Sequence, residues 1–401
     1  MFHRLRWYHY LLICVFLLFL FLHTYRLPTQ EFVGDEASPM LYIDRMWDGI
    51  FHHDIRFLAY PFLFYNDPFR GVIGGTLLHF FGPDRVLTRL PSIFFAVATF
   101  WFLVWVFEKE KVAPWLTVLA MITYAISGLV MNSRIAGGDS QGRFLILLSG
   151  YFVWKASEEK NVQKLRWGIW GWLAGMLTML DAIALFPGIV LATIKLHAIK
   201  DKTARRLIVS TFFLLAGYFF LWLLLPYLAY KSGFQQHYLN RGLFYYFSRT
   251  SEGTSNDPLK SARALITFTS IPFAIWLVLT FLLSFKMKKF WNLQLITLPT
   301  WIVVFLLNRS SFHIIMYSAL FFWQAVVVTN TLWQKFPRFK ILLATTLCII
   351  IIANAYQLYT EYLTNPDSSQ SEFSTGHLDV PQKGRNLDEA VVRIYESHTE
   401  K

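Results

Sequence analysis

The sequence predicts an all-α polytopic membrane protein with about eleven transmembrane helices and interfacial helices in its first outer loop. Hydrophobic residues make up 55% of the 401 residues, charged residues only 15%, and the mean hydropathy is +0.41. Soluble domains carry roughly 25% charged residues, so this chain cannot cover a globular surface with solvated side chains. Apolar runs near the roughly 20 residues that a bilayer requires recur along the chain. These observations exclude a soluble enzyme, a disordered chain and a collagen-like fibre.

The first apolar run, Tyr8–Thr24, follows Arg4 and Arg6 and lacks a small-residue cleavage site, which favours a retained anchor over a removed signal peptide. Ten further spans are expected at Ser92–Phe107, Trp115–Met131, Phe144–Ala156, Trp167–Leu180, Ala182–Leu196, Leu207–Tyr230, Ala264–Phe285, Trp291–Leu307, Phe312–Trp333 and Ile341–Tyr359. The run Pro68–Phe81 is short and rich in glycine, and we interpret it as an interfacial helix.

Lysine placement predicts the orientation. With a cytoplasmic N-terminus, 13 of the 17 lysines lie in or beside cytoplasmic segments, as the positive-inside rule requires. The first outer loop holds six carboxylates and three arginines between Tyr25 and Tyr60. Counting Pro68–Phe81 as a full span would place the lysine clusters outside. The formal charge of +12 therefore marks cytoplasmic turns and does not indicate a nucleic-acid partner.

These spans predict one transmembrane unit over residues 1–360, with outer loops at 25–91 and 231–263, and a polar non-cytoplasmic tail at 361–401. Cys14 and Cys348 lie inside apolar runs and are expected to be free thiols. The short N-terminal segment favours a bacterial or archaeal plasma membrane over the endoplasmic reticulum. Because the sequence contains no metal-type Cys/His spacing and no glycine-rich phosphate loop, chemistry is expected at helix ends and loops of the outer face.

Three outer segments hold candidate site residues. Asp35 and Glu36 open a helix that carries apolar residues on one face; they either supply a general base or only cap that helix. Arg134 and Asp139 lie in the turn Asn132–Arg143, where boundary charges indicate a functional site unless the pair only closes the turn.

Arg309, His313 and Tyr317 share one helical face. They suit a phosphate cradle, whereas the alternative is a cation that snorkels at a helix end. Arg241 and Arg249 lie among aromatic residues that are more typical of an interfacial belt. Asp181 is expected to cap the helix that starts at Ala182.

Five segments occur in a familiar order: the first helix, "GDEAS", "YNDPFRGVIGGTLLHFFG", "RLPS" and "SRIAGGD". Together they resemble the integral-membrane glycosyltransferases of the protein O-mannosyltransferase and aminoarabinose transferase superfamily, which have the GT-C fold. The resemblance runs to about residue 190, and more loosely through the helix that carries Tyr317.

The resemblance implies an inverting transferase that moves a sugar from a polyprenyl-phosphate donor to a lipid, glycan or protein acceptor outside the cytoplasm. It implies that Asp35 is the general base, with Glu36 as its partner, and that Asp139 positions the acceptor or the base. Arg134 matches the arginine upstream of that acid, and Tyr317 matches a tyrosine that contacts the lipid phosphate. No cofactor is required, although Mg or Mn held by the three acids stays an alternative.

The chain departs from the family at Asp67 and Asp181, where relatives often have lysines. Arg70, Arg241 or Arg309 are candidates to replace that positive charge, so the donor's identity stays open. Two other functions also stay open: a flippase or transporter for a lipid-linked saccharide, and a non-catalytic transferase subunit. Transporters usually show inverted repeats, and the sequence has no internal repeat.

Overall fold

The computed structural model describes residues 7–25, 34–53, 71–82, 84–128, 139–178, 180–197, 202–231, 265–266, 269–302 and 313–363. Within them all regular secondary structure is helical, which confirms the predicted all-α class. The helices are α1 (Trp7–Thr24), α2 (Gly34–Phe51), α3 (Val72–Phe81), α4 (Arg85–Lys109), α5 (Pro114–Ala125), α7 (Asp139–Glu159), α8 (Val162–Thr178), η3 (Leu180–Leu185), α9 (Phe186–His197), α10 (Lys202–Lys231), α13 (Ile271–Phe285), η5 (Lys288–Phe290), α14 (Trp291–Ile302), α15 (His313–Lys335), η7 (Pro337–Phe339), α16 (Lys340–Gln357) and η8 (Leu358–Leu363).

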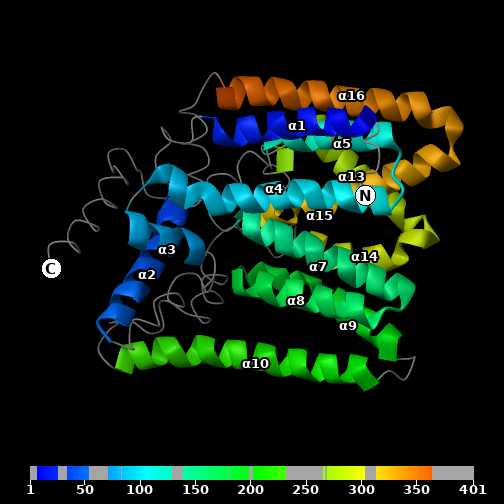
Figure 1. Ribbon diagram of the computed structural model, residues 1–401. Coiled ribbons are helices and arrows are strands. Elements are labelled where there is room, and N and C mark those ends of the chain that lie inside the picture. Colours follow the sequence, from blue (N-terminus) through cyan, green and yellow to red (C-terminus); the bar gives the residue numbers. More distant parts are fainter. Residues whose placement is uncertain are drawn as a thin grey trace, which may run out of the picture.

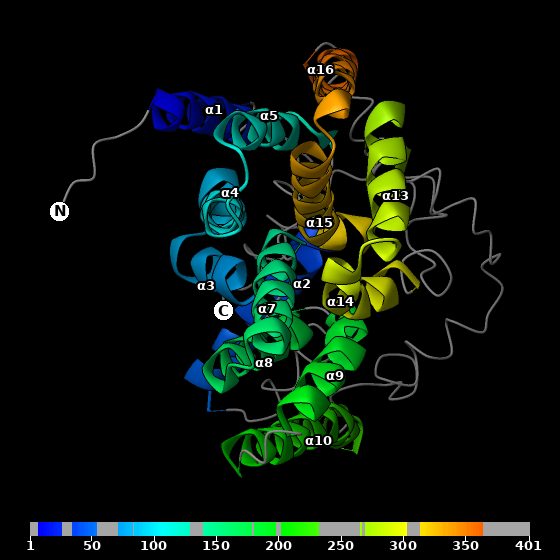
Figure 2. The same ribbon diagram turned by 90° about the vertical axis from the view of Figure 1, so that its right-hand side faces the viewer.

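Most of the long helices run side by side, and α2 and α3 lie across one end of this bundle (Figure 1). We call that end the α2 end. The turns that follow α4, α7, α13 and α15 lie at the opposite end, which we call the lysine end. Figure 2 looks along the bundle from the lysine end, and α2 crosses behind α7 and α8. The two ends therefore differ in architecture.

Helix α15 is the centre of the bundle. Every side chain from Tyr317 to Asn330 is buried, and the helix packs on α7, α13, α14 and α5. A helix that is apolar on all faces must be enclosed by other helices or by lipid. Glycines allow the closest approach elsewhere: α8 packs on α7 at Gly168 and Gly171, where an added Cβ would lie 2.6 Å from side chains of α7.

Among the described residues, three helices are long and apolar enough to cross a membrane: Trp7–Thr24, Val86–Lys109 and Lys340–Thr360. A fourth candidate is the pair Ile271–Phe285 and Lys288–Ile302, which is bent by 102° at its break. Shorter apolar helices occupy Val72–Phe81, Pro114–Ala125 and Ala182–Leu196. The structure thus contains candidate membrane spans, whereas the number eleven stays a prediction.

Several helices begin before the apolar runs that predicted them. The predicted span at Ser92 belongs to α4, which already begins at Arg85. The reason is local: Asp84 caps α4 by accepting the N–H groups of Val86 and Leu87 at 2.8 and 2.7 Å. Hydropathy marks the apolar part of a helix, whereas a cap marks its start.

The same correction applies to α7 and α8. Helix α7 begins at Asp139, inside the stretch that was predicted to be a turn, and α8 begins at Val162, where the Asn161 side chain accepts the N–H groups of Gln163 and Lys164. The run expected from Ala182 starts as the 3₁₀ helix η3. Pro187, near the start of α9, cannot donate to a preceding carbonyl, which favours this interruption. Cys14 and Cys348 are free, as predicted, and both are exposed.

Candidate functional site

The starts of three helices bring predicted site residues to the α2 end (Figure 1). Asp35 and Glu36 lie in the first turn of α2, Asp139 is the first residue of α7, and His313 is the first residue of α15. The side chains of these four residues lie outside the described set, as does that of Asp181 in η3. Arg70, Arg134, Arg241, Arg309 and Asp67 lie outside the described residues altogether.

The position of α2 is set by close packing against α3. A Cβ added to Gly75 would lie 2.5 Å from the Met40 carbonyl oxygen and 2.6 Å from the Ile43 Cβ. Gly74 is similarly tight, with the Met40 sulfur at 2.8 Å from an added Cβ. The two helices thus approach each other at backbone distance, which explains why α3 carries Gly74 and Gly75.

Polar contacts fix the same pair of helices. His79 Nδ1 of α3 lies 2.9 Å from Asp44 Oδ1 of α2, and Asp44 is only 4% exposed. One turn along α2, the Trp47 indole N–H donates to Thr76 Oγ1 at 2.9 Å. Sequence reasoning singled out neither His79 nor Asp44 as a site residue. Only the folded chain brings them together, because they are 35 residues apart.

Two buried arginines are the main site residues that sequence reasoning missed. Arg89, in the second turn of α4, is 1% exposed, and Arg143, in the second turn of α7, is fully buried. Both have interaction partners within the chain. Because removing a charge from water is costly, a buried guanidinium requires compensating groups and indicates a functional or organising role. Both helices begin at the α2 end, so both cations lie near that end.

Arg143 faces a tyrosine of a neighbouring helix. The guanidinium interacts electrostatically with Tyr124, whose ring is buried at the end of α5. Within the part of the chain that the structure describes, the Tyr124 hydroxyl has no hydrogen-bond partner of normal geometry. Tyr317 is also fully buried and stacks on Phe321, with ring centroids 6.0 Å apart. The α2 end thus contains a buried layer of arginine and tyrosine beneath the helix starts that carry the acids.

A signal for both arginines was present in the sequence. Arg89 belongs to "RLPS" and Arg143 closes the polar stretch before the run at Phe144, and both were assigned to outer loops. Extending each helix back to its capping residue would have placed them one turn or more inside the bundle. A charged residue inside a span is a candidate site by default.

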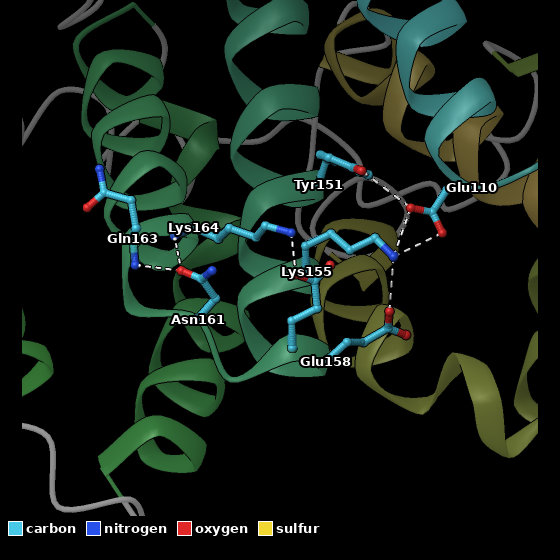
Figure 3. Close-up of polar contacts among 8 residues, drawn as sticks. Glu110, Tyr151, Lys155, Glu158, Asn161, Gln163 and Lys164 are labelled. Atoms are coloured by element: carbon cyan, nitrogen blue, oxygen red, sulfur yellow. Dashed lines mark hydrogen bonds and ion pairs between the residues drawn. The ribbon is translucent and has the colours of Figure 1, made fainter.

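The lysine end carries a different network, shown in Figure 3. The Lys155 ammonium lies 2.8 Å from Glu110 Oε1 and 3.3 Å from Glu158 Oε2, and the Tyr151 hydroxyl donates to Glu110 at 3.3 Å. Burial raises the pKa of the Glu158 carboxyl above its usual range, and the neighbouring Lys155 opposes that shift. This network joins the α4–α5 turn to the end of α7.

No group of three or more His, Cys, Asp or Glu side chains that could hold a metal occurs among the described residues. The alternative that Asp35, Glu36 and Asp139 hold Mg or Mn concerns side chains outside that set. Comparisons with protein-family models, curated proteins and solved structures found no match to this chain. The functional assignment therefore depends on the residues and their arrangement.

Proposed function

We propose that the protein is a membrane glycosyltransferase that moves a sugar from a polyprenyl-phosphate donor to an acceptor at the α2 end. The observation that carries the proposal is the convergence of the starts of α2, α7 and α15 at one end, above the buried Arg89 and Arg143. The lysine-rich turns lie at the other end of the bundle. Acids and cations at one membrane boundary suit a substrate that carries a phosphate.

In the proposed reaction the acceptor oxygen bonds to the anomeric carbon while the bond from that carbon to the phosphate oxygen breaks. Asp35 takes the acceptor proton, with Glu36 as its partner, and Asp139 positions the acceptor. The polyprenyl phosphate leaves with the bonding electrons, so no separate general acid is required. One displacement inverts the anomeric centre. A well-placed general base contributes roughly 10²–10⁴ in rate.

Positive charge for this site comes from arginine. The proposed contacts of the departing phosphate are Arg70, Arg134, Arg241, Arg309, His313 and Tyr317. Charge-assisted hydrogen-bond donors bind phosphate oxygens best. Arg89 and Arg143 supply the buried charge that the lysines of similar enzymes would supply, since this chain has Asp67 and Asp181 at those positions. A guanidinium keeps its charge when buried, whereas a lysine readily loses it.

The proposal includes eleven spans, a non-cytoplasmic α2 end and a bacterial or archaeal plasma membrane. Its support is the separation of lysines from the acidic helix starts, since positive residues accumulate on the cytoplasmic side. A transporter of lipid-linked saccharides and a non-catalytic subunit are the competing functions. No specific observation favours either of them.

The test is mass spectrometry of cell-envelope glycans and lipids in the source cell, without the gene and with each variant restored. The Asp35→Asn and Asp139→Asn variants should fail to restore a sugar that wild type adds, while still binding polyprenyl-phosphate sugar. The matched control is Glu159→Gln, which removes a carboxylate that contacts Lys164 at the lysine end. Full restoration by Asp35→Asn would show that this residue is not the base. The transporter would be favoured if wild type transferred no sugar and the Asp35→Asn variant still moved the lipid-linked saccharide across the membrane.

A further inference from the structure

Two regions of the lysine end differ in charge: the region of the α4–α5 and α7–α8 turns, and the region of the α13–α14 turn. The turns α4–α5 and α7–α8 contain all the carboxylates among the described residues of this end, and each has a basic partner. Glu108 contacts His9, Glu110 and Glu158 contact Lys155, and Glu159 contacts Lys164. The four carboxylates offset four of the six positive charges of Lys109, Lys111, Lys155, Lys160, Lys164 and Arg166, so we call this region the neutralised part of the lysine end.

The second part is the α13–α14 turn and the adjoining end of α9. The segment 286–289 consists of Lys286, Met287, Lys288 and Lys289, and its three lysines are exposed. Lys195 of α9 donates to Asn292 Oδ1 at the start of α14, which brings a fourth ammonium to the same turn. We call these four residues the lysine patch. None of them forms an ion pair with a described carboxylate.

The carboxylate that acts electrostatically on the patch is Glu158, which influences Lys289 without forming an ion pair and is already bound to Lys155. The turn itself is well held. Phe290 is completely buried, and its N–H donates to the Met287 carbonyl at 2.9 Å. The four charges are therefore concentrated on a fixed turn and form no ion pair with the described carboxylates.

The surroundings of the patch are apolar and exposed. Ile194, Leu282, Phe285 and Trp291 adjoin the four lysines and point away from the core, with Trp291 62% exposed. Tryptophan and phenylalanine beside lysine are typical of the boundary between hydrocarbon and headgroups. A soluble polyanion such as a nucleic acid would meet only the lysines, whereas a phospholipid would meet both the lysines and the apolar rim.

We propose that the lysine patch binds the headgroup phosphate of an anionic phospholipid in the leaflet at the lysine end. The lysine ammoniums would contact the phosphate, and the acyl chains would lie against the exposed rim of α9, α13 and α14. Clusters of basic residues directly beside membrane helices attract anionic lipids in this way. The site is separate from the α2 end and does not depend on the transferase proposal, although it does depend on a membrane location.

The test measures thermal unfolding of the full-length protein in neutral detergent with added phosphatidylglycerol or phosphatidylcholine. Phosphatidylglycerol should raise the midpoint of wild type more than phosphatidylcholine does, and added salt should reduce the difference. The triple variant Lys286→Gln, Lys288→Gln, Lys289→Gln should lose the difference. By a lipid titration its affinity should fall roughly tenfold to a hundredfold at low salt.

The matched control is Lys109→Gln, Lys111→Gln, Lys160→Gln, which removes the same charge from the neutralised part of the lysine end. It should keep the phosphatidylglycerol effect, as should Lys→Arg replacements of the three patch residues. The Asp35→Asn variant should also keep it, which separates this inference from the transferase proposal. The inference is wrong if the patch variant responds like wild type, if both triple variants lose the effect equally, or if both lipids stabilise wild type equally.

Discussion

Replacing Gly75 by alanine should displace α2 and reduce the proposed sugar transfer while leaving the rest of the bundle folded. The added Cβ would lie 2.5 Å from the Met40 carbonyl oxygen and 2.6 Å from the Ile43 Cβ, whereas ordinary contacts begin at 3.4 Å. Backbone carbonyl and Cβ atoms cannot rotate away as a flexible side-chain end can. Helix α2 must therefore retreat from α3 by about 0.9 Å, taken as the difference between the ordinary and the enforced contact distances.

The energetic cost follows from overpacking, which typically destabilises by about 1–3 kcal/mol. The better helix propensity of alanine offsets roughly 0.5–1 kcal/mol of that amount. The larger effect concerns position, since α2 carries Asp35 in its first turn. A misplacement of about 1 Å can reduce a catalysed rate by up to roughly 10²-fold. We therefore expect a large loss of transfer with a small change in the unfolding midpoint.

Two measurements check this prediction. Glycan mass spectrometry of cells that carry the variant reports transfer, and hydrogen exchange of the α2 amides reports the docking of the helix independently of function. The matched control is Gly217→Ala in α10, where an added Cβ meets no atom within 4 Å. The control should exchange and function like wild type. Wild-type exchange in α2 for Gly75→Ala would refute the packing argument, and wild-type transfer despite faster exchange would refute the link between α2 and catalysis.

Two further predictions concern stability. Asp84→Ala removes the acceptor of two N–H groups at the start of α4 and should cost about 1 kcal/mol, seen as a lower unfolding midpoint, whereas Asp84→Asn should retain the cap and the midpoint. Glu158→Gln tests the raised pKa of that carboxyl. Because the folded protein holds this proton more tightly than the unfolded chain, the stabilisation is complete below the unfolded pKa of about 4.3 and is lost as pH rises through the folded pKa. The glutamine variant should therefore gain in midpoint over wild type from pH 4 to pH 7, and a constant difference would contradict the assignment.

The sequence alone predicted the bounds of those helices in which the apolar run covers the whole helix. Helices α1, α15 and α16 agree with the runs Tyr8–Thr24, Phe312–Trp333 and Ile341–Tyr359 to within two residues at each end. In these helices the apolar run starts and ends where the helical backbone starts and ends. Helix α4 begins seven residues before the predicted run at Ser92, and α7 begins five residues before the run at Phe144. Hydropathy alone therefore misplaced both boundaries and hid Arg89 and Arg143.

The candidate site was only partly accessible to sequence reasoning. That Asp35 and Glu36 begin a helix followed from the local pattern, and the backbone of α2 confirms it. Contacts between distant segments could not be read in the same way. The pair Asp44 and His79, and the approach of Arg143 to Tyr124, depend on how α2 meets α3 and how α5 meets α7. No periodicity within a single segment contains that information.

The lysine patch is exposed, whereas the two buried cations Arg89 and Arg143 are arginines, and this difference has a physical reason. The lysine patch is exposed, where a hydrated ammonium on a flexible stem is stable and can follow a mobile headgroup. Arg89 and Arg143 are buried, where a lysine would tend to lose its proton and with it the charge. A guanidinium stays charged there, and its planar donors can bind several acceptors at once. A site that holds carboxylates and a phosphate together needs permanent positive charge. The buried arginines near the starts of α4 and α7 supply it, which is why we propose that the chemistry takes place at the α2 end.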